Sequence, residues 1–157
     1  MSAWHYTISD RAWLIFQDGL IKPATAGVRH PEKPVVWFST QQHWEPTANK
    51  MAYTTSGELI HMSTKMMFQE VGGELFRFGI GTHHLLPWHR LARAARIPIK
   101  VQKGLITTAR EAKADPMKWY GTLKPVPVID TIIQRYNPIK KEWVAAAANS
   151  KENLNAD

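Results

Sequence analysis

The sequence predicts a single α+β domain in which helices flank a β-sheet. Short runs of β-branched and aromatic residues, typical of strands, alternate with stretches whose apolar residues recur every three or four positions, typical of helices. The chain has 157 residues, of which 44% are hydrophobic. One domain of this length buries about 68–70% of its unfolded surface. We assign residues 1–144 to this domain, and residues 145–157, which are alanine-rich and then polar, to a disordered tail.

The first predicted strand and the first predicted helix are adjacent. Trp4–Thr7 combines aromatic residues with threonine, which favours a strand. Ser9 is expected to cap the following helix, and Asp10 suits its first turn because the helix dipole favours an acid there. Gly19 is expected to end the helix in a left-handed conformation. The apolar stripe of this helix contains Ala12, Leu14, Ile15 and Phe16.

The strongest strand pattern in the chain is Val35–Ser39, a continuous β-branched and aromatic run that predicts burial on both faces. Residues 24–34 lack periodicity and predict a loop, which is basic through Arg29, His30 and Lys33. The middle of the chain predicts a short helix or ordered loop over 41–51, a strand over 59–62, a helix over 64–71 and a half-buried strand over Glu74–Ile80.

Two helices and a pair of strands are predicted in the last third of the chain. Pro87 fits the first position of a helix that runs through Trp88 and Ala95, and Pro98 interrupts it. A second helix is expected over Val101–Ala114, with Val101, Leu105, Ala109 and Ala112 near one face. Asp115–Gly121 predicts a turn, and the terminal strands are expected over Val126–Tyr136 and Ile139–Val144.

Composition restricts the classes of function. Twenty Lys and Arg against thirteen Asp and Glu give a formal charge of +7, which favours nucleotides, nucleic acid or anionic lipid as partners, although such a charge also serves solubility alone. The absence of cysteine excludes disulfides, thiolate catalysis and cysteine-based zinc sites. No apolar run approaches the ~18 residues that span a bilayer, and no signal-peptide pattern opens the chain. We therefore expect a cytoplasmic protein that does not enter a membrane.

Three groups of residues are candidates for a binding or catalytic site. His5 and Thr7 are two positions apart on a strand, so their side chains share a face and suit a ribose or carboxamide; a half-buried structural histidine is the alternative. Ser39 and Thr40 end the second strand, where polar residues either line a cleft or cap the next segment. Glu45 lies within Trp44–Ala48. In a functional role it would orient a ribose or act as a base, whereas in a structural role it would begin a short helix whose first turn favours an acid.

Other motifs are weaker indicators. The histidines at 83, 84 and 89 lack the spacing and the accompanying carboxylate of a metal site, so we expect no metal. The chain contains no GxGxxG, GxxxxGK[ST] or GxSxG motif, which argues against Rossmann, P-loop and α/β-hydrolase chemistry. Arg90, Arg93, Arg96 and Lys100 either face phosphates or form a solvated helix face. Trp119 and Tyr120 either stack on a base or pack at the edge of the core.

The order of motifs over residues 3–51 resembles the first part of an ADP-ribosyltransferase-like domain. The shared features are the His5-Tyr6-Thr7 strand, a helix that ends in a Gly-Leu turn at Asp18-Gly19-Leu20, and the strand Trp37-Phe38-Ser39. RNA 2′-phosphotransferases and several bacterial toxins resemble this layout, and the chain is similar to small bacterial proteins with a Trp-His-Tyr-Thr start. The resemblance implies a mixed or antiparallel split sheet and NAD as the cofactor.

The resemblance also implies roles for particular residues. His5 and Thr7 would hold a ribose of NAD, and the cofactor-binding set would be completed by Trp37, Ser39 and Thr40. His5 and Glu45 are the expected catalytic residues. The family places a catalytic acid late in the domain, for which Glu74, Asp130 and Glu142 are further candidates. We therefore expect ADP-ribose transfer to a protein or nucleic-acid target, with a non-catalytic nucleotide or nucleic-acid binding module as the alternative.

Overall fold

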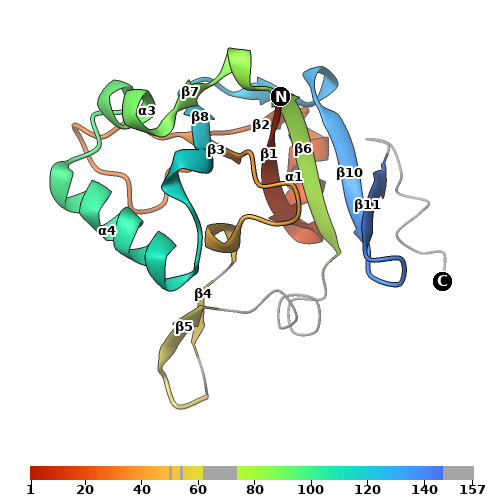
Figure 1. The fold of residues 1–157 in the computed structure, drawn as a ribbon, viewed down its shortest axis with the longest axis horizontal. Coiled ribbons are helices and arrows are strands. Elements are labelled where there is room, and N and C mark those ends of the chain that lie inside the picture. The colour runs from red at the N-terminus through yellow and green to blue at the C-terminus, as the bar shows by residue number, and fades with distance from the viewer. Residues whose placement is uncertain (50, 54, 62–73, 147–157) are drawn as a thin grey trace.

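The computed structural model describes residues 1–49, 51–53, 55–61 and 74–146, and its main feature is a seven-stranded sheet (Figure 1). The strand order is β11-β10-β6-β1-β3-β8-β7, and every described pairing is antiparallel. The strands are β1 (Ser2–Ile8), β3 (Val36–Ser39), β6 (Leu75–Gly81), β7 (Leu86–Pro87), β8 (Trp119–Thr122), β10 (Ile132–Asn137) and β11 (Glu142–Ala145).

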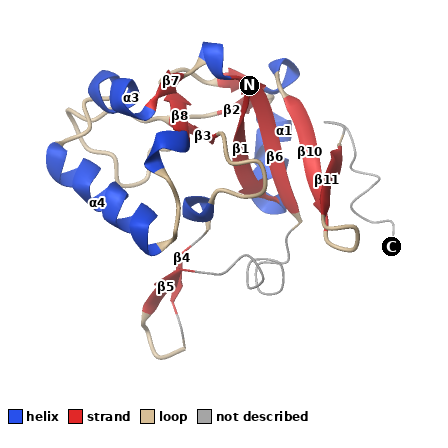
Figure 2. Cartoon of the chain, viewed as in Figure 1, coloured by secondary structure: helices blue, strands red, loops and turns tan. Residues whose placement is uncertain are grey.

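Three described helices and two short strand pairs accompany this sheet (Figure 2). The helices are α1 (Ser9–Asp18), α3 (Trp88–Ala94) and α4 (Ile99–Glu111). The pairs are β2 (Leu20–Ile21) with β9 (Val126–Pro127), and β4 (Met51–Tyr53) with β5 (Leu59–His61). Among the described residues no helix is long and apolar enough to cross a membrane. The predicted α+β class, with a sheet and flanking helices in one chain, is confirmed.

The sheet is almost divided between β1 and β3. These neighbours are joined by one residue pair, Trp4 with Ser39, whereas β1 pairs with β6 along its whole length from Ser2 to Ile8. Beyond Trp4 the two strands part, since no later residue of β1 is paired with β3. The site described below lies at this junction.

Helix α1 covers one face of the sheet. Ala12 is buried, and Ile15 and Phe16 pack against core residues that include Phe76 and Phe78. The helix ends at Gly19 in the left-handed conformation (φ 66°), as predicted. Two details were wrong. Ile8, not Ser9, is the N-cap residue and no side chain caps the helix, and Leu14 is exposed because it lies on the solvent side of the helix.

A second core lies under α3 and α4, where three tryptophans meet. Trp88 from α3 packs edge-on against Trp119 of β8, with ring centroids 5.3 Å apart, and Trp37 of β3 lies about equally close to both. Leu91 and Ala109 are fully buried here. Pro87 is the N-cap of α3 rather than its first helical residue, and α4 begins directly after Pro98, two residues before the predicted start.

Strand β6 differs most from its predicted environment. Its residues Leu75–Ile80 are all buried, so the strand is not half-buried. The polar position in the alternation, Arg77, is 7% exposed because its guanidinium lies between the rings of Trp4 and Trp143, at 3.9 and 4.5 Å from their centroids. Aromatic side chains thus cover a cation that the sequence pattern assigned to solvent.

The C-terminal part of the chain is more finely divided than predicted. The expected strand over Val126–Tyr136 consists of β9, a 3₁₀ turn at Val128–Asp130 and β10, and the expected turn over Asp115–Gly121 contains most of β8. The predicted strand over 59–62 is observed as Leu59–His61. The predicted helix over 64–71 and residues 147–157 of the predicted tail lie outside the described residues. Ala145, the first residue of that tail, is instead the last residue of β11 and pairs with Gln134.

Candidate functional site

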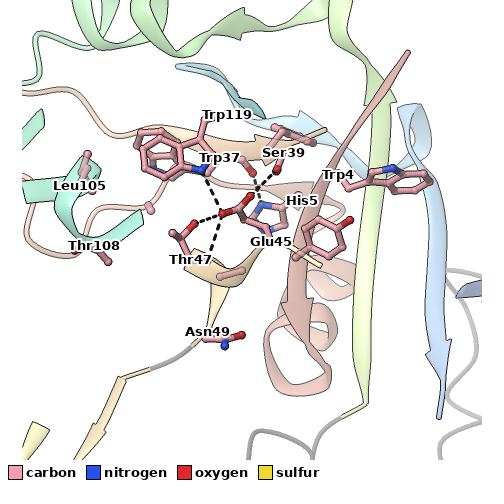
Figure 3. A pocket seen from close by; sticks show the side chains of 14 residues that line it. Trp4, His5, Trp37, Ser39, Glu45, Thr47, Asn49, Leu105, Thr108 and Trp119 are labelled. Atoms are coloured by element: carbon pink, nitrogen blue, oxygen red, sulfur yellow. Dashed lines mark hydrogen bonds between the residues drawn. The ribbon is translucent and has the colours of Figure 1, made fainter. Parts of the chain in front are cut away.

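A cavity of about 450 Å³ opens where β1 and β3 part (Figure 3). Strands β1, β3 and β8, the 3₁₀ turn at Pro46–Ala48 and helix α4 all contribute to its wall. Four of the six residues predicted to form a site line it: His5, Trp37, Ser39 and Glu45. Ligand pockets in proteins are typically about 300–1,000 Å³ in volume, so this cavity is large enough for one half of a dinucleotide.

His5 lies across the junction between the two strands. Its Nδ1 is 2.9 Å from the carbonyl oxygen of Trp37, and its ring packs beside Phe38 and Phe78 on the face that α1 covers. A carbonyl oxygen only accepts hydrogen bonds, so Nδ1 carries the proton in this contact. The gap in the sheet lets His5 line the same cavity as Trp37 and Ser39, which lie on β3.

Glu45 is the carboxylate of the cavity, and it is 6% exposed. Its Oε1 accepts three hydrogen bonds: from Trp119 Nε1 at 3.2 Å, from Thr47 Oγ1 at 2.6 Å and from the Thr47 backbone N–H at 3.3 Å. Its Oε2 accepts one, from Ser39 Oγ at 2.7 Å. Indole and backbone N–H groups only donate, so Oε1 must accept, and the network holds the carboxyl group of Glu45 in one orientation.

The loop at 41–45 that carries Glu45 is attached to the sheet by Tyr6, Arg77 and Trp143. The Tyr6 hydroxyl donates to the carbonyl of Gln41, and Arg77 Nη1 donates to the carbonyl of Gln42. Trp143 Nε1 donates to the carbonyl of His43 at 2.8 Å, and its ring is parallel to that of Trp44. Strands β1, β6 and β11 therefore fix this loop together.

Burial affects the two ionisable groups of this attachment in opposite directions. Burial raises the pKa of Tyr6 above its ordinary value, a shift that the neighbouring Arg77 partly offsets. Burial lowers the pKa of Arg77, partly offset by its contact with the Tyr6 hydroxyl at 3.5 Å. Both shifts result from removal of the charged forms from water.

Thr7 and Thr40, the other two predicted site residues, do not line the cavity. Thr7 is buried on β1 opposite Phe76 of β6, two residues beyond His5. Thr40 bonds to the carbonyl of Lys118 through its backbone N–H at 2.9 Å and, weakly, through its hydroxyl at 3.4 Å. Their expected roles in cofactor binding stay predictions, and the structure gives both residues other contacts.

Only one of the four carboxylates considered as the catalytic acid lies at the cavity. Glu45 lines it, whereas Glu74, Asp130 and Glu142 do not. Glu74 precedes β6 and faces Arg135 at 3.4 Å, Asp130 is exposed in a 3₁₀ turn, and Glu142 is exposed on β11. The acid that the resemblance places late in the domain is thus not found at this cavity among the described residues.

Sequence reasoning missed part of the wall. Leu105 and Thr108 of α4 line the cavity, although α4 begins some 60 residues after β3. Trp119 was considered for stacking or for core packing, but its bond to Glu45 was not expected. An aromatic N–H donor and a buried acid are complementary, yet no spacing along the chain connects residues 45 and 119.

The described residues contain no group of three or more His, Asp or Glu side chains arranged to hold a metal ion. His83 and His84 lie against each other on the turn before β7, with ring centroids 3.9 Å apart.

Comparison of the chain with protein-family models, curated proteins and solved structures finds no match.

Proposed function

We propose that the protein binds NAD in the cavity between β1 and β3 and transfers ADP-ribose to a protein or nucleic-acid target. The observation that carries this proposal is the convergence of His5, Trp37 and Glu45, which come from three segments, on one cavity. An imidazole, an indole face and a fixed carboxylate are suited to a planar ring joined to a ribose.

The residues of the wall fit the nicotinamide half of NAD. The indole of Trp37 offers a flat apolar surface to the nicotinamide ring, and His5 contributes its imidazole to the same wall. Oε1 of Glu45 already has three donors, whereas Oε2 has one. Oε2 is therefore the atom with room to accept a further hydrogen bond, from a ribose hydroxyl.

The bond from C1′ of the ribose to the nicotinamide nitrogen breaks while the acceptor's nucleophile forms a new bond to C1′. Nicotinamide leaves with the electron pair as a neutral molecule, and the acceptor gives up a proton. Positive charge develops on the ribose during this exchange. A carboxylate held at that place by four hydrogen bonds stabilises the charge without having to reorient. The remaining contribution is the positioning of the two reactants.

Thermal unfolding with NAD tests the binding step. At ten times its Kd, a ligand stabilises the folded state by about 1.4 kcal/mol, which corresponds to roughly 3–5 °C in Tm for a domain of this size. We expect this shift for the wild type and its loss in His5→Ala. His83→Ala removes an exposed imidazole remote from the cavity and should keep the shift. The absence of any shift at millimolar NAD would overturn the proposal.

Release of nicotinamide tests the chemical step. Glu45→Gln should abolish release and keep the NAD-dependent shift in Tm, whereas Glu142→Gln, a matched change of an exposed acid on β11, should leave release unchanged. Both carboxylate oxygens of Glu45 already accept a hydrogen bond from a hydroxyl group, that of Ser39 or that of Thr47. This observation favours the second candidate, a module that binds a nucleotide without turnover. An NAD-dependent shift without release of nicotinamide by the wild type would select that candidate.

A further inference from the structure

The end of the molecule formed by α3 and α4 contains most of the excess positive charge. Residues 88–113 have seven Lys and Arg and one Glu, a net charge of +6 within a chain whose formal charge is +7. Within the described part of the chain none of these seven cations forms an ion pair, since the two salt bridges found there involve Lys22 and Arg135. All seven are exposed: Arg90, Arg93, Arg96, Lys100, Lys103, Arg110 and Lys113.

The charge is concentrated where α3 ends and α4 begins. Arg96 follows the C-cap of α3, and Lys100 and Lys103 lie in the first two turns of α4. Lys33, from the basic loop over 24–34, is brought to the same place because its backbone N–H donates to the carbonyl of Ala95 at 2.8 Å. This corner is defined by Lys33, Arg96, Lys100 and Lys103. It lies at the junction of α3 and α4, which is on the left of Figure 1.

Local helix energetics do not explain these residues. The N-terminal end of a helix is partially positive and favours acids, but the first turn of α4 has no acid and contains Lys100. Arg96 has a φ of 52°, the left-handed conformation in which glycine is preferred after a helix. Lys113 and Lys141 also have positive φ values, so the feature peculiar to this corner is a start of α4 that has a lysine and no acid.

We infer that this corner binds the phosphodiester backbone of a nucleic acid. Four exposed cations without ion pairs, drawn from a loop, a helix terminus and a helix start, suit a flexible chain of regularly spaced negative charges. The inference concerns a surface outside the NAD cavity and does not depend on NAD binding. It favours nucleic acid over protein as the target of the proposed transfer.

Binding of fluorescein-labelled 20-nucleotide single-stranded DNA, single-stranded RNA and duplex DNA, measured by anisotropy without NAD from 0.05 to 0.3 M salt, tests the inference. Each phosphate contact contributes about 0.7 to the slope of log K against log salt for single strands, or about fivefold in affinity at 0.1 M. Lys100→Glu with Lys103→Glu should weaken binding by at least about 25-fold and lower the slope by about 1.4.

The chain provides matched controls at the opposite end of the molecule, in the turn between β10 and β11 (Figure 1). Lys140→Glu with Lys141→Glu makes the same charge change there. Arg96→Gly removes one charge and relieves a positive φ, and Lys141→Gly does the same at φ 55°. Both glycine variants should keep or raise Tm by up to a few degrees, but only Arg96→Gly should lose affinity, by about fivefold.

Three results would overturn the inference. The first is no binding of any of the three oligonucleotides at 0.05 M salt. The second is an equal loss of affinity in the two double variants, which would show attraction by overall charge instead of binding at this corner. The third is competition by polyglutamate as strong as that by an oligonucleotide of equal charge, which would point to acidic protein partners. Because NAD is absent, failure here leaves the NAD-dependent shift in Tm as a separate measurement.

Discussion

The hydroxyl of Ser39 donates a hydrogen bond of 2.7 Å to Oε2 of Glu45, and both side chains are buried. Ser39 ends β3 at its only pairing with β1, so this bond attaches the carboxylate to the point where the sheet parts. The same hydroxyl accepts a hydrogen bond of 3.1 Å from the backbone N–H of Gln41. Ser39 therefore orients Glu45 in this structure, in addition to any contact with a cofactor that the sequence predicts.

Two substitutions of Glu45 test whether its four hydrogen bonds contribute to the stability of the fold. Glu45→Ala leaves four donors without an acceptor, two of them buried and two partly buried. Each unsatisfied buried donor costs about 1–3 kcal/mol, so we expect a loss of at least ~3 kcal/mol in the free energy of unfolding. Glu45→Gln keeps an oxygen for the three donors at Oε1, and its amide can donate to Ser39, so a loss of only ~1–2 kcal/mol is expected. Urea denaturation measures both, and equal losses would contradict the network.

Tyr6 is expected to make stability depend on alkaline pH. Its pKa is raised in the folded state, so the folded protein retains the proton longer than the unfolded chain does. The stabilisation is complete below the unfolded value of 10.0 and is lost as pH rises through the folded value. Tyr6→Phe cannot lose this proton. The advantage of the wild type over Tyr6→Phe, about 1 kcal/mol for the buried hydrogen bond, should stay constant up to pH 9 and shrink above pH 10.

Urea unfolding of both proteins at pH 7, 9, 10 and 11 measures that difference. The pKa of Arg77 is lowered in the folded state, so this group alone adds stability as pH rises through its folded value. Because Arg77 is present in both proteins, most of its contribution cancels in the comparison. A difference that stays constant to pH 11 would show that the Tyr6 hydroxyl is not protected by burial.

Two glycines should respond to alanine with opposite signs. Gly19 ends α1 at a φ of 66°, where a Cβ is strained, so Gly19→Ala should destabilise the protein by about 1 kcal/mol. Gly104 lies inside α4, and a Cβ there would meet nothing within 4 Å. Gly104→Ala should therefore stabilise by about 0.5–1 kcal/mol. Thermal unfolding of both variants checks the prediction, and a loss of stability in Gly104→Ala would contradict the α4 environment described here.

The local elements were largely predictable because their causes are local. The strand at Trp4–Thr7, the helix that ends at Gly19 and the strand at Val35–Ser39 follow from β-branched runs, apolar periodicity and the conformational freedom of glycine. The burial of Arg77 was not predictable, because an alternating pattern assigns polar side chains to solvent. The aromatic rings that cover it, Trp4 and Trp143, come from opposite ends of the chain.

The candidate site shows the same division. The sequence indicated that His5, Trp37, Ser39 and Glu45 carry suitable chemistry, since imidazole, indole, hydroxyl and carboxylate groups occur within the first two predicted strands or shortly after the second. It could not show that Thr7 and Thr40 lie outside the cavity, or that Leu105, Thr108 and Trp119 complete its wall. Those positions depend on how β1 and β3 part and on how α4 packs.

The sequence by itself determined the α+β class, most of the helices and strands, the basic charge and the chemical character of the first two strands. The tertiary structure alone decided which of the four carboxylates faces the cavity and which side chains hold it. The physical reason is that hydrogen bonds such as Trp119 to Glu45, and contacts such as Arg77 to Trp143, join residues more than 60 positions apart. Chain spacing carries no information about such pairs, and they form only when the sheet and its helices have packed.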